Sequence, residues 1–163
     1  GLEMKVMILS DSHHISKTDL LTLLKNNHVD YYIHCGDIYK SFDKITLPNF
    51  YLVKGNNDYN TKIPDELLIS IDNQLFFVTH GHRYTFKQLI TIAKQKKANV
   101  VCFGHSHQPL SLLIDDMIVI NPGSICLPRG HYHFPTYCIY DTKNKKVTFY
   151  NIKTHQPCNP FNN

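Results

Sequence analysis

The chain has 163 residues, of which 42% are apolar and 18% charged, so it has the size and composition of one globular domain. Its apolar runs are only a few residues long, whereas a membrane span needs about 18 to 20, so no membrane segment is expected. The net charge is +4, but the lysine clusters lack interleaved aromatic residues, and we do not expect nucleic-acid binding through charge alone.

The first residues and the cysteines bear on processing and compartment. Residues 1–3 precede Met4 and resemble the remnant of an expression tag, so we expect one domain over residues 4–163. The apolar run after Met4 is cut short at Ser10, too early for a signal peptide. Five scattered cysteines without a CxxC pair favour buried, unreactive thiols in a reducing compartment. The expected location is therefore the cytoplasm.

In chain order, the hydrophobic pattern predicts a buried strand over residues 5–9 and then a helix capped by Ser16, with Asp19 in a capping-box position. Two further strands are predicted, and the stretch between them is long enough for another helical segment. A strand-rich half with one helix follows. The predicted segments after the first helix are 31–34, 50–53, 67–71, 75–79, the helix 86–97, 100–103, 110–114, 117–120, 137–140 and 147–152. This order predicts two packed sheets with helices outside, an α/β sandwich.

Five polar clusters each follow a predicted strand directly, and this edge of an open α/β sheet is where ligands bind. They are Asp11-Ser12-His13, Gly36-Asp37, Gly55-Asn56-Asn57-Asp58, His80-Gly81-His82 and Gly104-His105-Ser106-His107. Carboxylate, imidazole and amide ligands without thiolate suit Mn, Fe, Zn or Ni. Seven candidate ligands are too many for one ion with an open position, whereas two ions sharing a carboxylate would use them all.

The motifs DxH, GD, GNxD, a His-Gly pair and GHxH, in this order, resemble those of the calcineurin-like metallophosphoesterases. The resemblance is strongest to their small single-domain bacterial and archaeal phosphodiesterases. It covers residues 4 to 152 and includes Asn121-Pro122-Gly123-Ser124 and Pro128-Arg129. It implies a four-layered α/β/β/α sandwich of two mixed sheets flanked by helices.

The resemblance also implies a dinuclear site. The first ion would be held by Asp11, His13 and His107, and the second by Asn56, His80 and His105, with Asp37 bridging them. The cofactors would be two divalent metal ions, manganese first, with Ni, Fe or Zn as alternatives. A hydroxide bridging the ions would attack the phosphorus of a small phosphodiester. The implied catalytic set is Asp37, Asn56, His80 and Asn57.

Asn57 departs from the family, in which many members have histidine and the small phosphodiesterases often have cysteine. Asparagine donates a hydrogen bond but transfers no proton at neutral pH, so a preference for activated or cyclic diesters is expected. Asp58 is expected to brace its loop rather than to bind metal. Substrate contacts are predicted for His82, Arg83 and Arg129, each with a purely structural role as the alternative.

Two other functions stay open. One is a phosphomonoesterase or nucleotide phosphatase using the same site. The other is a non-catalytic scaffold, like the retromer subunit that resembles these enzymes but has lost part of the ligand set. All seven ligand positions here hold competent residues, which favours an enzyme. Related small phosphodiesterases often self-associate, so a homo-oligomer is a further expectation.

Overall fold

The computed structural model describes residues 3–39, 45–59, 62–130 and 132–161. Part of the expected tag remnant and part of the expected helical segment between the second and third strands lie outside these residues. The elements are β1 (Lys5–Leu9), α1 (Lys17–Lys25), β2 (Tyr31–His34), β3 (Phe50–Leu52), β4 (Glu66–Ile71), β5 (Gln74–Thr79), α2 (Phe86–Gln95), β6 (Val100–Cys102), β7 (Leu110–Ile114), β8 (Met117–Asn121), β9 (Thr136–Asp141), β10 (Lys146–Asn151) and β11 (Gln156–Cys158).

The strands form two mixed sheets. The first sheet has six strands in the order β11-β10-β9-β1-β2-β3, and the second has five in the order β4-β5-β6-β8-β7. In the first sheet β1 runs parallel to β2 and β2 to β3, whereas β9 pairs antiparallel with β1. In the second sheet β5, β6 and β8 are parallel. The parallel strands of each sheet therefore end at a common edge.

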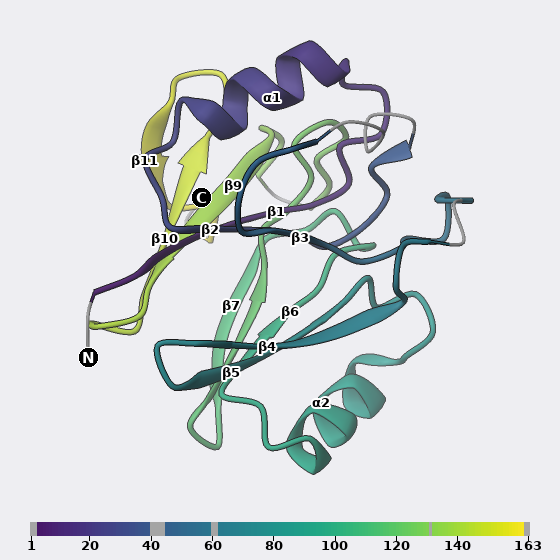
Figure 1. The fold of residues 1–163 in the computed structure, drawn as a ribbon, viewed down its shortest axis with the longest axis vertical. Helices are drawn as coiled ribbons and strands as arrows, with labels where there is room; N and C mark the ends of the chain where they lie inside the picture. Colours follow the sequence, from purple (N-terminus) through teal and green to yellow (C-terminus); the bar gives the residue numbers. More distant parts are fainter. Residues whose placement is uncertain (1–2, 40–44, 60–61, 131, 162–163) are drawn as a thin grey trace.

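Three apolar clusters hold the layers together. The largest lies between the two sheets and includes Ile8, Phe76 and Tyr140. A second cluster packs Leu20 and Leu24 of α1 on the first sheet, and a third packs α2 on the second sheet. Figure 1 shows α1 and α2 on the outer faces of the stacked sheets. The predicted α/β/β/α sandwich is confirmed.

Both helices begin at capping residues. The Ser16 hydroxyl accepts a hydrogen bond from the backbone N–H of Asp19 (3.1 Å), so the predicted N-cap of α1 is confirmed. At α2 the sequence analysis missed a full capping box, in which Thr85 and Gln88 exchange hydrogen bonds of 3.2 and 2.9 Å. Neither described helix has the length and apolar character that crossing a membrane requires.

The cysteines are free thiols, and three of them, Cys35, Cys102 and Cys138, are buried. Burial raises the pKa of each of these thiols above its ordinary value, which keeps them protonated and unreactive at neutral pH. The prediction of buried, unreactive thiols is confirmed for these three, whereas Cys126 and Cys158 are partly exposed.

Candidate metal centre

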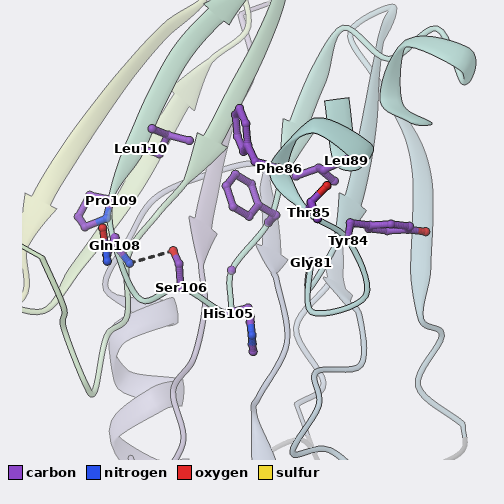
Figure 2. A pocket seen from close by; sticks show the side chains of 12 residues that line it. Gly81, Tyr84, Thr85, Phe86, Leu89, His105, Ser106, Gln108, Pro109 and Leu110 are labelled. Carbon is purple, nitrogen blue, oxygen red and sulfur yellow. Dashed lines mark hydrogen bonds between the residues drawn. The ribbon is translucent and has the colours of Figure 1, made fainter. Parts of the chain in front are cut away.

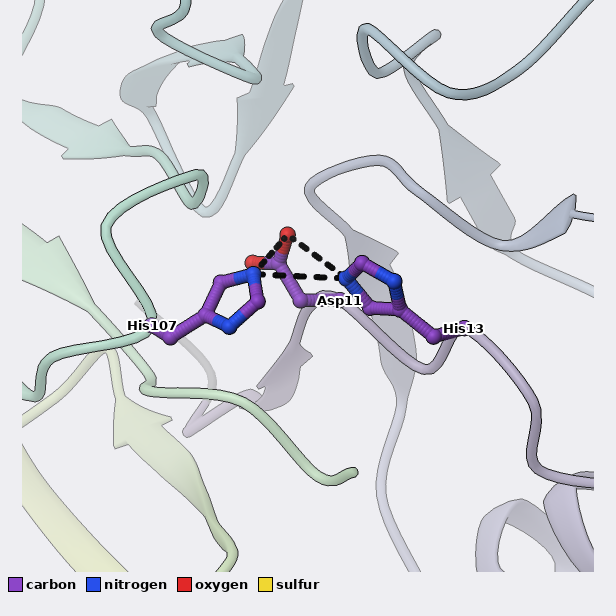
Figure 3. Close-up of side chains that lie close together, drawn as sticks. All are labelled: Asp11, His13 and His107. Carbon is purple, nitrogen blue, oxygen red and sulfur yellow. Dashed lines mark hydrogen bonds and ion pairs between the residues drawn. The ribbon is translucent and has the colours of Figure 1, made fainter. Parts of the chain in front are cut away.

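The five polar clusters meet where the parallel strands of both sheets end. Asp11 and His13 follow β1, Asp37 follows β2, and Asn56 lies in the loop after β3. From the second sheet, His80 follows β5, and His105 and His107 lie in the loop after β6. Figure 3 shows Asp11 with His13 from its own loop and His107 from the facing one. Residues far apart in the sequence thus form one cluster.

Asp11 lies at the centre of this cluster and is fully buried. Its Oδ1 atom lies 3.3 Å from Nε2 of His107, 3.6 Å from Nε2 of His13 and 3.8 Å from Nε2 of His80. The other oxygen, Oδ2, accepts hydrogen bonds from the Ser10 hydroxyl (2.7 Å) and the His105 backbone N–H (3.1 Å). Among the described residues Oδ1 has no hydrogen-bond partner. A buried carboxylate oxygen facing imidazole nitrogens without hydrogen bonds suits a cation.

Asp37 is the second central carboxylate. Its Oδ2 atom lies 3.5 Å from Nε2 of His80 and 3.7 Å from Nε2 of His13. The ligand atoms of Asp11, His13 and His107 form one group within 4.8 Å of one another, and those of Asp11, Asp37 and His80 form another. Asp37 therefore lies between one imidazole from each of the two sets that the sequence motifs imply.

Two of the histidines, His80 and His107, are oriented by hydrogen bonds so that Nε2, the nitrogen available for a metal, faces the cluster. Nδ1–H of His80 donates to the carbonyl of Cys35, and Nδ1–H of His107 donates to that of Leu127, both at 2.8 Å. Because the proton is on Nδ1 in both rings, each Nε2 presents a lone pair to the cluster. This tautomer and outer hydrogen bond are usual for metal-binding histidine.

Asn56 and His105 complete the set on the exposed side of the cluster. The Asn56 Oδ1 atom lies 2.9 Å from Nε2 of His80 and 3.1 Å from Nδ1 of His105. The seven side chains predicted as ligands therefore form one cluster. His105 and Asn56 are exposed, whereas Asp11, His13 and His80 are buried, so the cluster opens to solvent on the side of His105 and Asn56.

The loops that carry these ligands adopt backbone conformations that few sequences tolerate. Positive φ angles between 43° and 69° occur at five predicted ligands, which are Asp11, His13, Asp37, His105 and His107. Such strain costs about 1–3 kcal/mol per residue and is typical of functional sites. Gly55 and Gly104 are needed for space, because an added Cβ would lie 2.1 Å from Oδ1 of Asp37 and from Oγ of Ser10, respectively.

Two neighbouring side chains hold Asp37 and its loop. The Asp58 carboxylate accepts hydrogen bonds from the backbone N–H groups of Asp37 (2.8 Å), Tyr39 (2.8 Å) and Gly55 (2.9 Å), so the expected bracing role is confirmed. Asn57 donates its backbone N–H to Oδ1 of Asp37 (2.9 Å) and its side-chain Nδ2–H to Oδ2 (3.1 Å). The Asn57 side chain therefore contacts the proposed bridging carboxylate directly.

The residues predicted to contact substrate lie at different distances from this cluster. The His82 ring lies against the rings of His80 and His105, with centroids 5.4 and 6.1 Å apart, and its buried Nδ1 lacks a hydrogen-bond partner among the described residues. Arg83 forms an ion pair with Asp65 (2.9 Å). Arg129 is exposed, and its backbone N–H donates to the carbonyl of His107 (3.0 Å). Direct substrate contact by these three stays a prediction.

The cluster is anionic at neutral pH. Burial acts to raise the pKa of Asp11, but the neighbouring imidazoles of His107, His13 and His80 and the hydrogen bond from Ser10 bring that pKa well below its ordinary value. For Asp37, burial is likewise outweighed by His80 and Asn57, and its pKa is lowered. Burial opposes the charged form of His80, but Asp37 and Asp11 raise its pKa overall. Two ionised, buried carboxylates attract cations.

Sequence reasoning missed two residues that support the cluster. Nδ1 of His34 accepts from the backbone N–H of Gly36 (3.1 Å), and its Nε2–H donates to the Ser12 hydroxyl (2.9 Å). Burial lowers the pKa of His34 to about 3, so this imidazole is a neutral link between two ligand loops. The Tyr39 hydroxyl lies 2.5 Å from Nδ1 of His13. A histidine at the end of a buried strand was a usable signal for the first, but nothing in the sequence pointed to the second.

Comparison with known proteins agrees with this geometry. Residues 4–145 match the calcineurin-like phosphoesterase superfamily domain. The probable metallophosphoesterase YsnB of Bacillus subtilis is 38% identical over 151 residues, covering 89% of this chain and 88% of that protein. Phosphodiesterase MJ0936 of Methanocaldococcus jannaschii is 31% identical, covering 88% of this chain and 96% of that protein.

Solved structures show the same fold. A predicted phosphoesterase from Streptococcus pneumoniae superposes with a TM-score of 0.85 at 26% identity, covering 97% of this chain and 94% of that one. Vacuolar Protein Sorting 29 from Cryptosporidium parvum superposes with a TM-score of 0.77 at 14% identity, covering 97% of this chain and 96% of that one, and this similarity concerns the fold alone. The domain match and the two sequence relatives identify the family: the chain belongs to the calcineurin-like phosphoesterase superfamily, in which its relatives are named as a metallophosphoesterase and a phosphodiesterase.

Proposed function

We propose that the chain is a dinuclear metal-dependent phosphodiesterase. The observation that carries this proposal is the Oδ1 atom of Asp11, which is buried, lacks a hydrogen-bond partner among the described residues and faces Nε2 of His13, His80 and His107. The distances of 3.3–3.8 Å between this oxygen and the imidazole nitrogens are too long for good hydrogen bonds. They suit ligand atoms that are directed at a common ion. The donor set therefore fits divalent cations.

In this proposal the ligands divide as the family motifs imply. Asp11, His13 and His107 would hold the first ion, and Asn56, His80 and His105 would hold the second. Asp37 would bridge them, which is supported by the position of its Oδ2 between Nε2 of His13 and Nε2 of His80. Imidazole, carboxylate and amide ligands without thiolate fit manganese, with nickel, iron and zinc as alternatives.

Such a pair of ions, held by these residues, would neutralise phosphoryl charge and would lower the pKa of bound water, so that hydroxide would be available for attack on phosphorus at neutral pH. The protein's own contribution is to hold its ligands in place before substrate arrives. Cys35 and Leu127 carbonyls fix the rings of His80 and His107, and Asp58 fixes the backbone around Asp37. Asn57 directs the Asp37 carboxylate, and the second N–H of its amide would donate a hydrogen bond to a leaving-group oxygen.

Diesters are the proposed substrates because the sequence is 31% identical to a protein named a phosphodiesterase over most of both chains. A phosphomonoesterase acting at the same cluster is the second candidate, since the exposed side of the cluster excludes neither class. A scaffold of this fold is disfavoured because all seven ligand positions hold competent residues that lie together. The buried free thiols support a cytoplasmic location as part of the proposal.

The test is hydrolysis of bis(p-nitrophenyl) phosphate by chelator-treated protein, with and without added Mn²⁺, alongside p-nitrophenyl phosphate. We expect no diester cleavage without metal, restoration by Mn²⁺, and faster cleavage of the diester than of the monoester. Monoester cleavage that exceeds diester cleavage would favour the phosphatase. Folded protein that binds metal but cleaves neither ester with any divalent ion would contradict an enzyme and favour the scaffold.

A change of Asn57 to histidine tests its proposed role at the leaving group. Histidine can transfer a proton, so Asn57→His should accelerate release of a poor leaving group such as phenolate more than release of p-nitrophenolate. The measurement is the rate ratio of the two aryl diesters for both proteins. Asn57→Ala is the matched control, because it removes the contact with Asp37 without adding a proton donor. Equal acceleration of both esters would contradict a role for residue 57 at the leaving group.

A further inference from the structure

A hollow of about 320 Å³ opens beside the metal cluster, between the start of α2 and the loop that joins β6 to β7. Figure 2 shows Thr85, Phe86 and Leu89 on one wall and Pro109 and Leu110 on the other, with His105 at one end. The volume is at the lower end of the range for small-molecule sites and is large enough for a ring system. We refer to it as the Phe86 pocket.

The Phe86 pocket offers apolar and aromatic surface. No lysine, arginine, aspartate or glutamate lines it within the described part of the chain. The Phe86 ring is exposed at 44% and lies 6.2 Å, centroid to centroid, from the ring of Phe103. Tyr84 also lines this pocket, and its hydroxyl already donates to Oε2 of Glu66 (2.5 Å). The walls thus favour an uncharged flat group over a second phosphate.

His105 joins this pocket to the metal cluster. It is one of the residues that line the pocket, while its Nδ1 atom lies 3.1 Å from Oδ1 of Asn56. Gly104, whose missing side chain leaves room for Ser10 and Asp11, also belongs to both. If a phosphoryl group were bound at the cluster, one of its ester groups could therefore reach the mouth of the pocket.

We propose that the Phe86 pocket binds an uncharged aromatic ester group of the phosphodiester substrate. This inference rests on the proposed function, since the phosphoryl group must be held at the metal cluster. An aromatic group in the pocket contacts the face of Phe86 and the apolar side chains of Leu89 and Leu110. The pocket thereby selects aryl or nucleobase-bearing diesters over diesters with only small alkyl groups.

The test compares binding of phenylphosphonate and methylphosphonate to Mn²⁺-loaded protein by calorimetry. Both probes carry the same anionic group, so the ratio of their dissociation constants measures how much the phenyl group contributes to binding. The measurement does not depend on turnover. We expect phenylphosphonate to bind about tenfold more tightly, as aromatic stacking of this kind usually provides. In Phe86→Ala the preference should fall to within about twofold, with methylphosphonate binding unchanged. Leu110→Ala, on the opposite wall, should also reduce the preference.

Phe161→Ala is the matched control, because Phe161 is 51% exposed and packs on Phe149 of the first sheet, away from the pocket. It should retain the preference of the wild type. Equal affinity for both probes in the wild type would overturn the aromatic pocket while leaving the metal cluster supported. Absence of binding by either probe would overturn the pocket together with the phosphoryl site. Hydrolysis of bis(p-nitrophenyl) phosphate, measured separately, decides the proposed function.

Discussion

Replacing Asp37 by alanine should reduce metal-dependent diester hydrolysis about a hundredfold or more, since even side chains outside the ligand set commonly contribute 10–100-fold. The Oδ2 atom of Asp37 lies 3.5 Å from Nε2 of His80 and 3.7 Å from Nε2 of His13, so its loss would remove one ligand from both proposed ions. We therefore also expect fewer manganese ions to be bound per chain. The measurements are steady-state rates and metal stoichiometry by calorimetry.

Asp115→Ala provides the control for this experiment. Asp115 is an exposed aspartate paired with Lys94 at the turn between β7 and β8, so it should retain both activity and metal binding. Far-ultraviolet circular dichroism should show that both variants keep their secondary structure. If Asp37→Ala retained a tenth of the wild-type rate, the bridging assignment would be wrong.

Replacing Asp58 by alanine should lower the free energy of unfolding by about 3 kcal/mol or more, because each buried N–H left without a partner costs about 1–3 kcal/mol. The Asp58 carboxylate accepts hydrogen bonds from four backbone N–H groups, those of Asp37, Ile38, Tyr39 and Gly55, in two separate loops. The loss should appear in urea unfolding as a lower midpoint without a change in slope. Activity should fall too, because these loops carry Asp37 and Asn56.

Asp58→Asn is the informative companion variant. Asparagine keeps one acceptor oxygen but presents an N–H₂ group toward backbone donors, so its stability should lie between those of Asp58→Ala and the wild type. Asp115→Ala removes an aspartate side chain from an exposed ion pair and should leave the unfolding midpoint close to that of the wild type. Stability of Asp58→Ala equal to that of the wild type would contradict the bracing role.

The sequence predicted most of the fold because its strands are short apolar runs that end abruptly in polar residues. The strand before Asp11 and the strand before His80 are of this kind, and both were found. β11 was missed because Gln156–Cys158 contains Pro157 and has no apolar pattern. It pairs with β10 at the edge of the first sheet, where proline is tolerated. The formation of β11 depends on its pairing with β10, and the local hydrophobic pattern of residues 156–158 does not encode this pairing.

The site was predicted to the extent that its chemistry lies in short motifs. Residues two apart after a strand, such as Asp11 and His13, carry a local signal. The support of those ligands depends on contacts between distant segments, such as the Tyr39 hydroxyl at Nδ1 of His13. The ion pair of Arg83 with Asp65 is of the same kind. No sequence pattern reports such pairings, which depend on how the loops pack.

The division of the ligand cluster between the two sheets has a consequence for how the domain holds together. Asp11, His13 and Asp37 follow strands of the first sheet, whereas His80 and His107 follow strands of the second. Apolar packing joins the sheets along their inner faces, and the cluster lies at one end of that interface. An ion bound there would link the two sheets. Because its ligands lie together only when the sheets are docked, the free energy of ion binding would add to the free energy of docking. Occupancy would then report the integrity of the whole sandwich.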